Sequence, residues 1–210
     1  MSSYVLSCTV SSSVGDTGRG GYRTSQYLTY AANTEELDYI VSMAYSQPPV
    51  GLGEAALDAT AMLARDHEQL RRLLVDLADA SASGAFDRKK ELFRMFKAAL
   101  HVHATLEEEV FYPAVMKLRS AWAREAVREA LEEHQAVDSI VAELDQMEPE
   151  DNQYDAKLLG LRASVEHHIS QEESAMFAEA RNHLTDDRLQ ALGRQMASLL
   201  EKMPGEGPGL

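Results

Sequence analysis

Four of the seven histidines lie within apolar stripes of helical period, and their placement restricts the fold more than any other feature. His67 has Leu63, Leu70 and Leu74 at offsets of −4, +3 and +7. Apolar residues occupy corresponding offsets around three further histidines, namely His103, His134 and His168. Side chains spaced three, four and seven residues apart share one face of a helix. We therefore expect four helices to bring four imidazoles into one interior.

Two of these histidines carry a carboxylate one helical turn later. Glu107 follows His103 by four residues, and Glu172 follows His168 by four residues. A helix with a single interior histidine is therefore followed by a helix with His-x3-Glu, and this order occurs twice along the chain. The repetition predicts two related helical hairpins that supply six candidate ligands from four inner faces.

The fold class expected from this pattern is all-α. From Glu54 onward there are no strand signals, and helix-forming residues dominate between well-spaced breakers. Pro113 is an internal exception, which we expect to kink the second helix. Four long helices with short connections predict an up-down-up-down antiparallel bundle, with a shorter fifth helix after Thr185. The expected long helices cover about 54–81, 88–118, 121–147 and 153–182, with Asp87 as the N-cap of the second.

The composition changes near residue 53, which suggests a domain boundary. Residues 1–53 are rich in Ser, Thr, Gly and Tyr and lack a regular period, so we expect a poorly ordered N-terminal extension. Within it, residues 34–46 could form a short helix. The bundle is expected to cover residues 54–203, and residues 204–210 are expected to form a tail.

Charge and composition exclude several classes of function. The formal net charge of −14 disfavours binding to nucleic acid or to an anionic membrane surface. The chain has no apolar run long enough to span a bilayer. Cys8 is the single cysteine, so no internal disulfide can form. We therefore expect a cytoplasmic protein.

The inward carboxylates favour a metal centre. A single interior histidine is usually a hydrogen-bonded core residue, and a single His-x3-Glu is usually an ion pair at the rim. Two buried carboxylates facing each other, however, cost several kcal/mol unless a cation compensates them. Six ligands suit two metal ions, and imidazole with carboxylate but no thiolate points to iron or, second, manganese. The predicted ligands are His67, His103, Glu107, His134, His168 and Glu172.

The remaining histidines and neighbouring carboxylates are expected to play other parts. His101, His167 and His183 fall on polar flanks, so we place them at the surface or the rim. Glu108 and Glu109 are turned away from Glu107 by the helical period, so they should be solvated or lie behind the ligands. Asp138 lies one turn after His134 and faces the site, where it could orient a histidine or a bound water.

Four segments resemble the hemerythrin-like (HHE cation-binding) family. They are ARDHEQLRRLL, HVHATLEEEVFYPAV, EEHQAV and VEHHISQEESAMF, which together lie within residues 57 to 182. The resemblance implies that the six candidate residues are ligands of two irons. Oxygen-carrying members have a fifth histidine where this chain has Asp138, which puts simple oxygen carriage in doubt. The ligand set is closer to members that repair iron–sulfur centres, but residues 1–53 do not look like their cysteine-bearing N-terminal domain.

Three functions follow as hypotheses. The protein could bind or sense dioxygen, nitric oxide or peroxide at a carboxylate-bridged di-iron centre. Alternatively, it could be a di-iron redox enzyme that degrades peroxide or nitric oxide, or that aids iron–sulfur repair. A third possibility is iron storage or delivery. A stable adduct without turnover would favour the first, turnover the second, and loosely held metal the third.

Overall fold

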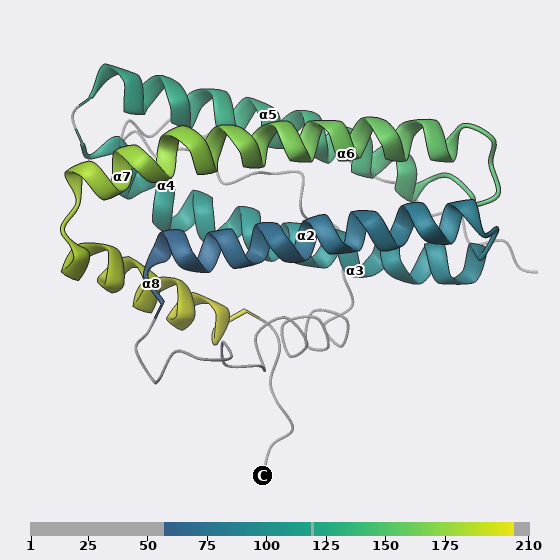
Figure 1. Ribbon diagram of the computed structural model, residues 1–210, viewed down its shortest axis with the longest axis horizontal. Helices are drawn as coiled ribbons and strands as arrows, with labels where there is room; N and C mark the ends of the chain where they lie inside the picture. The colour runs from purple at the N-terminus through teal and green to yellow at the C-terminus, as the bar shows by residue number, and fades with distance from the viewer. Residues whose placement is uncertain (1–56, 119, 204–210) are drawn as a thin grey trace, which may run out of the picture.

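A computed structural model of the protein describes residues 57–118 and 120–203, and these residues form helices and connecting segments without a strand. The predicted N-terminal extension, its short helix and the C-terminal tail lie outside the described residues. The helical segments are drawn in Figure 1, and their bounds are α2 (Ala59–Ala82), α3 (Phe86–Leu106), η1 (Glu107–Phe111), α4 (Tyr112–Met116), α5 (Ala121–Asp145), α6 (Tyr154–Gln171), η2 (Glu172–Met176), α7 (Phe177–His183) and α8 (Asp186–Leu200).

The long helices lie in two layers. Helix α2 packs along α3, and α5 packs along α6, while the chain reverses direction at each connection (Figure 1). Helix α8 crosses below the end of the assembly where α4 and α7 lie, and it contacts α2. The prediction of an all-helical fold is confirmed for the described residues.

The buried apolar residues form two clusters. One contains Leu63, Leu106 and Phe177, and the other contains Leu70 and Leu161. Along each long helical segment, the interior histidine falls where the chain passes from one cluster to the other. A polar layer therefore divides the core, and apolar packing on both sides holds the four histidines in position.

Hydroxyl and carboxylate caps fix three of the helix starts. The side chains of Asp58, Ser120 and Thr185 accept hydrogen bonds from backbone N–H groups in the first turns of α2, α5 and α8. The expected start of the first helix at residue 54 was wrong, because Asp58 caps a helix that begins at Ala59. The assignment of Asp87 as an N-cap was also wrong, since Asp87 lies inside the first turn of α3.

Two long helical segments each contain a π-helical turn, which holds one residue more than an α-helical turn. The turn η1 lies between α3 and α4, and η2 lies between α6 and α7. Each wide turn begins at one of the two predicted glutamate ligands, Glu107 or Glu172. The backbone N–H of Tyr112 donates to the Glu107 carbonyl, and that of Phe177 donates to the Glu172 carbonyl. Such turns occur often at functional sites. Pro113 is the second residue of α4, one residue beyond the start of that helix at the end of η1, so its missing N–H falls where the hydrogen-bond register already changes.

Helix α8 is held against the start of α2 by a close backbone approach. Gly193 lies against the carbonyl oxygen of Leu57, and a Cβ atom at position 193 would fall 2.1 Å from that oxygen. Only glycine leaves room for this contact.

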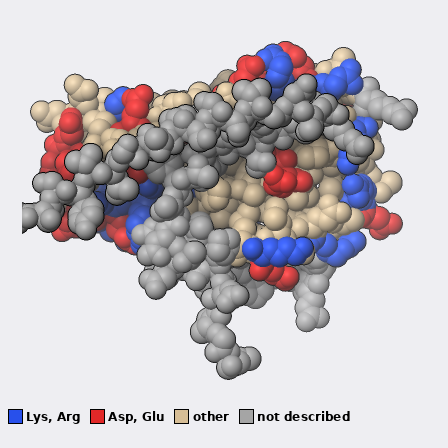
Figure 2. Space-filling view, turned by 180° about the vertical axis from the view of Figure 1, so that it is seen from behind, with Lys and Arg blue, Asp and Glu red and all other residues tan. Residues whose placement is uncertain are grey.

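Among the described residues, no helix combines the length and the apolar character needed to cross a membrane. In the view from behind, acidic and basic side chains lie around an area of other residues (Figure 2). The coloured residues on this face therefore form no continuous basic surface.

Candidate metal centre

The six predicted ligands meet in one buried place, where they fall into two groups that share a residue. His67, His103, Glu107 and Glu172 offer ligand atoms within 4.8 Å of one another, and so do Glu107, His134 and His168. His134 is the most exposed of the six, with 10% of its side chain accessible. The arrangement of the ligand atoms in these two groups suits two neighbouring cations.

Glu107 lies at the middle of the centre. Its Oε1 atom is 3.1 Å from Nε2 of His103 and 3.9 Å from Nε2 of His67. Its Oε2 atom is 3.2 Å from Nε2 of His134 and 3.8 Å from Nε2 of His168. Each oxygen therefore faces a different pair of histidines, as a carboxylate that bridges two cations would.

Glu172 occupies a less central position. Its Oε2 atom is 3.3 Å from Nε2 of His67, and it belongs to only one of the two groups. On the other side, the Nε2 atoms of His134 and His168 are 3.4 Å apart. The sequence pattern does not distinguish the two glutamates, whereas in the structure only Glu107 belongs to both groups of candidate ligands.

Three of the four imidazoles are held from behind by further carboxylates. The distances from Nδ1 to the nearest carboxylate oxygen are 2.9 Å for His67 and Glu173, 2.9 Å for His134 and Glu108, and 3.0 Å for His168 and Glu133. A carboxylate that accepts the Nδ1 proton leaves the Nε2 lone pair directed at the centre, which is the tautomer a metal requires.

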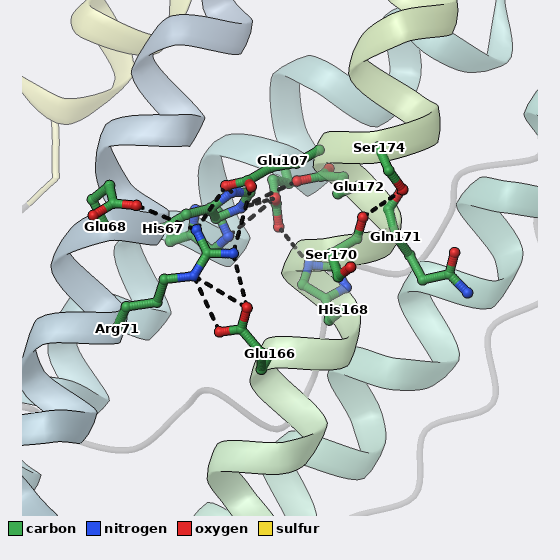
Figure 3. Close-up of polar contacts among 12 residues, drawn as sticks. His67, Glu68, Arg71, Glu107, Glu166, His168, Ser170, Gln171, Glu172 and Ser174 are labelled. Atoms are coloured by element: carbon green, nitrogen blue, oxygen red, sulfur yellow. Dashed lines mark hydrogen bonds and ion pairs between the residues drawn. The ribbon is translucent and has the colours of Figure 1, made fainter.

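An arginine extends one of these contacts to the surface of the bundle. Arg71 donates from Nη1 to Glu173 at 3.0 Å. It also donates from Nη2 to Glu166 at 3.0 Å (Figure 3). Glu173 in turn contacts His67. The chain of contacts ties α2 to α6 and to η2, and it limits the rotation of the His67 ring.

Aromatic rings that follow the wide turns cover two of the histidines. Phe177 stacks on His67 with ring centroids 5.7 Å apart, and Tyr112 lies against His134 with centroids 5.8 Å apart. The two positions correspond, because each is the residue directly after a wide turn. They differ in that the Tyr112 hydroxyl lies 3.4 Å from Nε2 of His134.

The polar atoms at the centre fit a bound cation. Both carboxylate oxygens of Glu107 and of Glu172 are buried without a hydrogen-bond partner, as are the Nε2 atoms of His67 and His103. Buried polar groups left in this state cost free energy, because they lose their bonds to water and gain none in return. Cations at the shared centre would satisfy these atoms together.

Comparison with known proteins agrees with this geometry. The family model of the hemerythrin HHE cation-binding domain matches residues 58–180. The chain belongs to this family. A DNA nickase of Nostoc sp. (strain PCC 7120 / SAG 25.82 / UTEX 2576) is 25% identical to this hemerythrin-domain chain over 138 residues. That match covers 66% of the chain but 38% of the relative, and no solved structure matches the chain.

Without metal, the charges of the hemerythrin centre are balanced by protons. Burial lowers the imidazole pKa values, but contacts with Glu107 and the other carboxylates outweigh it at three positions. The resulting pKa values are about 9 for His67, about 10 for His134 and about 9 for His168. Burial prevails at His103 and lowers its pKa to about 4. Burial together with the charge of Glu107 raises the pKa of Glu172 to about 7. A cation would replace the imidazole protons.

The structure also places the residues that were expected to lie outside the ligand set. His167 and His183 are exposed and His101 is half-buried, which agrees with the expected positions at the surface or the rim. Glu109 is exposed, and Glu108 lies behind His134. Asp138 is half-buried and lines a small cavity beside the hemerythrin centre.

Sequence reasoning missed Glu133, Glu173 and Tyr112. Glu173 could have been found from the repeat, because both His-x3-Glu motifs continue with a second glutamate. These second glutamates, Glu108 and Glu173, each reach the single interior histidine of the other hairpin. Tyr112 gave no signal, since its position depends on the wide turn.

A small apolar cavity adjoins the hemerythrin centre. It has a volume of about 20 Å³ and is lined by His103, His134 and His168 together with side chains such as Leu100 and Val165. A cavity that holds one water needs on the order of 10–15 Å³ on this measure. The space therefore suits one molecule of two or three atoms, and its apolar lining favours an uncharged one.

Proposed function

We propose that this protein is a non-haem di-iron protein that binds or senses a small molecule, namely dioxygen, nitric oxide or peroxide. The proposed ligands are His67, His103, Glu107, His134, His168 and Glu172, and the proposed scaffold is an up-down-up-down four-helix bundle. The observation that carries the proposal is the position of Glu107, whose two oxygens face two separate pairs of buried histidines.

Iron is the proposed metal, with manganese the less favoured choice, because the donors are imidazole and carboxylate without thiolate. Two irons would supply the electrons and open coordination positions for a small molecule. The chain's own residues hold the imidazoles in the required tautomer and provide an apolar space of about 20 Å³ beside three of the histidines.

A second candidate function is a di-iron redox enzyme that degrades peroxide or nitric oxide. The observation that favours it is the Tyr112 hydroxyl, which lies within the buried centre 3.4 Å from Nε2 of His134. Burial and the charges of Glu107 and Glu172 raise the pKa of Tyr112 well above its usual range, so the hydroxyl keeps its proton at neutral pH. A buried proton donor is a group that such an enzyme would use.

The DNA nicking named for the relative is not part of the proposal. The matched portion covers only 38% of that protein, and the net charge of −14 opposes contact with DNA phosphates.

The test begins with metal analysis of the purified protein and its visible spectrum in air. About two irons per chain with oxo-bridge absorption supports the proposal. The reduced protein is then mixed with dioxygen, nitric oxide or hydrogen peroxide in a stopped-flow instrument. A stable adduct supports binding, and multiple turnovers support the enzyme. Less than about half a metal per chain after anaerobic loading with iron would refute both functions.

A further inference from the structure

A second and larger cavity reaches the centre from the surface of α5. Its volume is about 220 Å³, and it runs between α5 and the segment formed by α6 and η2. Trp122 and Glu125 line it where their side chains are 41% and 64% exposed. His168 and Glu172 line it where they are buried. The cavity therefore connects exposed residues with two of the proposed ligands.

Carboxylates follow this cavity at regular steps. Glu125, Glu129 and Glu133 lie four residues apart on α5, so they share one face of the helix about 6 Å apart along its axis. Their burial increases toward the centre, because Glu125 and Glu129 are exposed and Glu133 is 18% exposed. Glu172 completes the series with a side chain that is 1% exposed.

The inner end of the series points to a ligand. Both carboxylate oxygens of Glu172 are buried without a hydrogen-bond partner, and Glu172 lines the cavity. Glu133 lies between the outer glutamates and the centre, since its Oε2 atom contacts Nδ1 of His168 at 3.0 Å. At the outer end, Glu125 pairs with the exposed Arg128, whereas no ion pair of Glu129 occurs within the described part of the chain.

We propose that this cavity is the entry route of the metal itself, along which carboxylates pass a hydrated divalent cation from solvent to the centre. The inference rests on the proposed function, because it requires a cation site at the inner end. Oxygen donors spaced about 6 Å apart can hold a hydrated cation in turn without trapping it, since each site offers one carboxylate. The same negative charge repels anions from this face.

The test measures how fast the full-length metal-free protein takes up iron(II) under anaerobic conditions, followed by its final iron content. In Glu129→Gln and in the double variant Glu125→Gln/Glu129→Gln, we expect loading to slow by roughly threefold to tenfold with unchanged final iron content. Raising the salt concentration should slow wild-type loading and affect the double variant much less.

Glu132→Gln is the matched control. It removes one exposed carboxylate from the same helix and a partner of the same Arg128, but Glu132 does not line the cavity. It should load at the wild-type rate. A second variant, Ala126→Phe, fills the cavity without changing the charge and should also slow loading.

If the Glu129→Gln variant and the double variant took up iron at the wild-type rate and with the wild-type dependence on salt, the entry route would be overturned. Equal slowing in Glu132→Gln would also overturn it, because the effect would then come from net charge. Failure of the proposed function itself is distinguishable, because the wild-type protein would then not reach two irons at any loading time.

Discussion

Replacing Glu107 with glutamine tests the central position of this residue most directly. The substitution keeps the shape of the side chain and removes the negative charge that faces four imidazoles. Two groups of candidate ligands share Glu107, whereas Glu172 belongs to one. We therefore expect Glu107→Gln to bind less than half an iron per chain, Glu172→Gln to keep about one, and the exposed control Glu109→Gln to keep about two.

The same variant should destabilise the metal-free protein. Contacts with Glu107 keep His67, His134 and His168 protonated at neutral pH, so the variant leaves buried positive charge with less compensation. Removing one partner of a buried ion pair costs about 3–5 kcal/mol. Each kcal/mol corresponds to about 2–4 °C in a chain of this size, so the melting temperature should fall by roughly 10 °C.

Glu172→Gln should behave in the opposite way without metal. The pKa of Glu172 is raised from 4.5 to about 7, so its ionised form destabilises the fold, and that penalty grows as the pH rises from 4.5 to about 7 and is complete above it. At about pH 8, the metal-free variant should be at least as stable as the wild type. Thermal denaturation followed by circular dichroism, together with iron analysis, measures both effects. A metal-free Glu107→Gln protein that melts within about 2 °C of the wild type would refute the charge balance described above.

Four further predictions concern the metal, protons and packing. Removing the metal with a chelator should lower the melting temperature, because a ligand at a hundred times its Kd stabilises the fold by about 2.7 kcal/mol; an unchanged transition would mean that no structural cation was present. Iron(II) binding at neutral pH should release about three to four protons per chain to a pH-indicator dye, since three imidazoles and Glu172 have raised pKa values, and release should diminish as the pH rises through 7 to 10. Tyr112→Phe should keep two irons and a wild-type melting temperature but change the lifetime of the adduct in stopped-flow measurements, because it removes only the hydroxyl near His134; a change in iron content would contradict this placement. Gly193→Ala should lower stability by about 1–3 kcal/mol in urea denaturation, because its Cβ would overlap the Leu57 carbonyl oxygen, and a neutral effect would contradict the close packing of α8.

The sequence predicts the parts of the site that follow from a constant helical period. The spacings around His67 and between His103 and Glu107 depend only on the face of a helix, and the structure brings these residues together as expected. Glu133 was missed because it lies about 100° from His134 by that period, so its contact with His168 depends on how α5 packs against α6. The position of Tyr112 depends on a wide turn, and apolar periodicity does not reveal the gain of one residue in a turn.

The two wide turns also set the phase between the halves of their helices. Each turn adds one residue at a glutamate of the centre, and the aromatic ring that covers a histidine follows directly after it. Deleting one residue from either turn would restore the α-helical register and rotate everything beyond it by about 100°. Phe177 would then turn away from His67, and the apolar face of α7 would leave the core. In a designed or diverged relative, the chain length between the glutamate and the aromatic residue is therefore as strict a requirement as the ligands themselves.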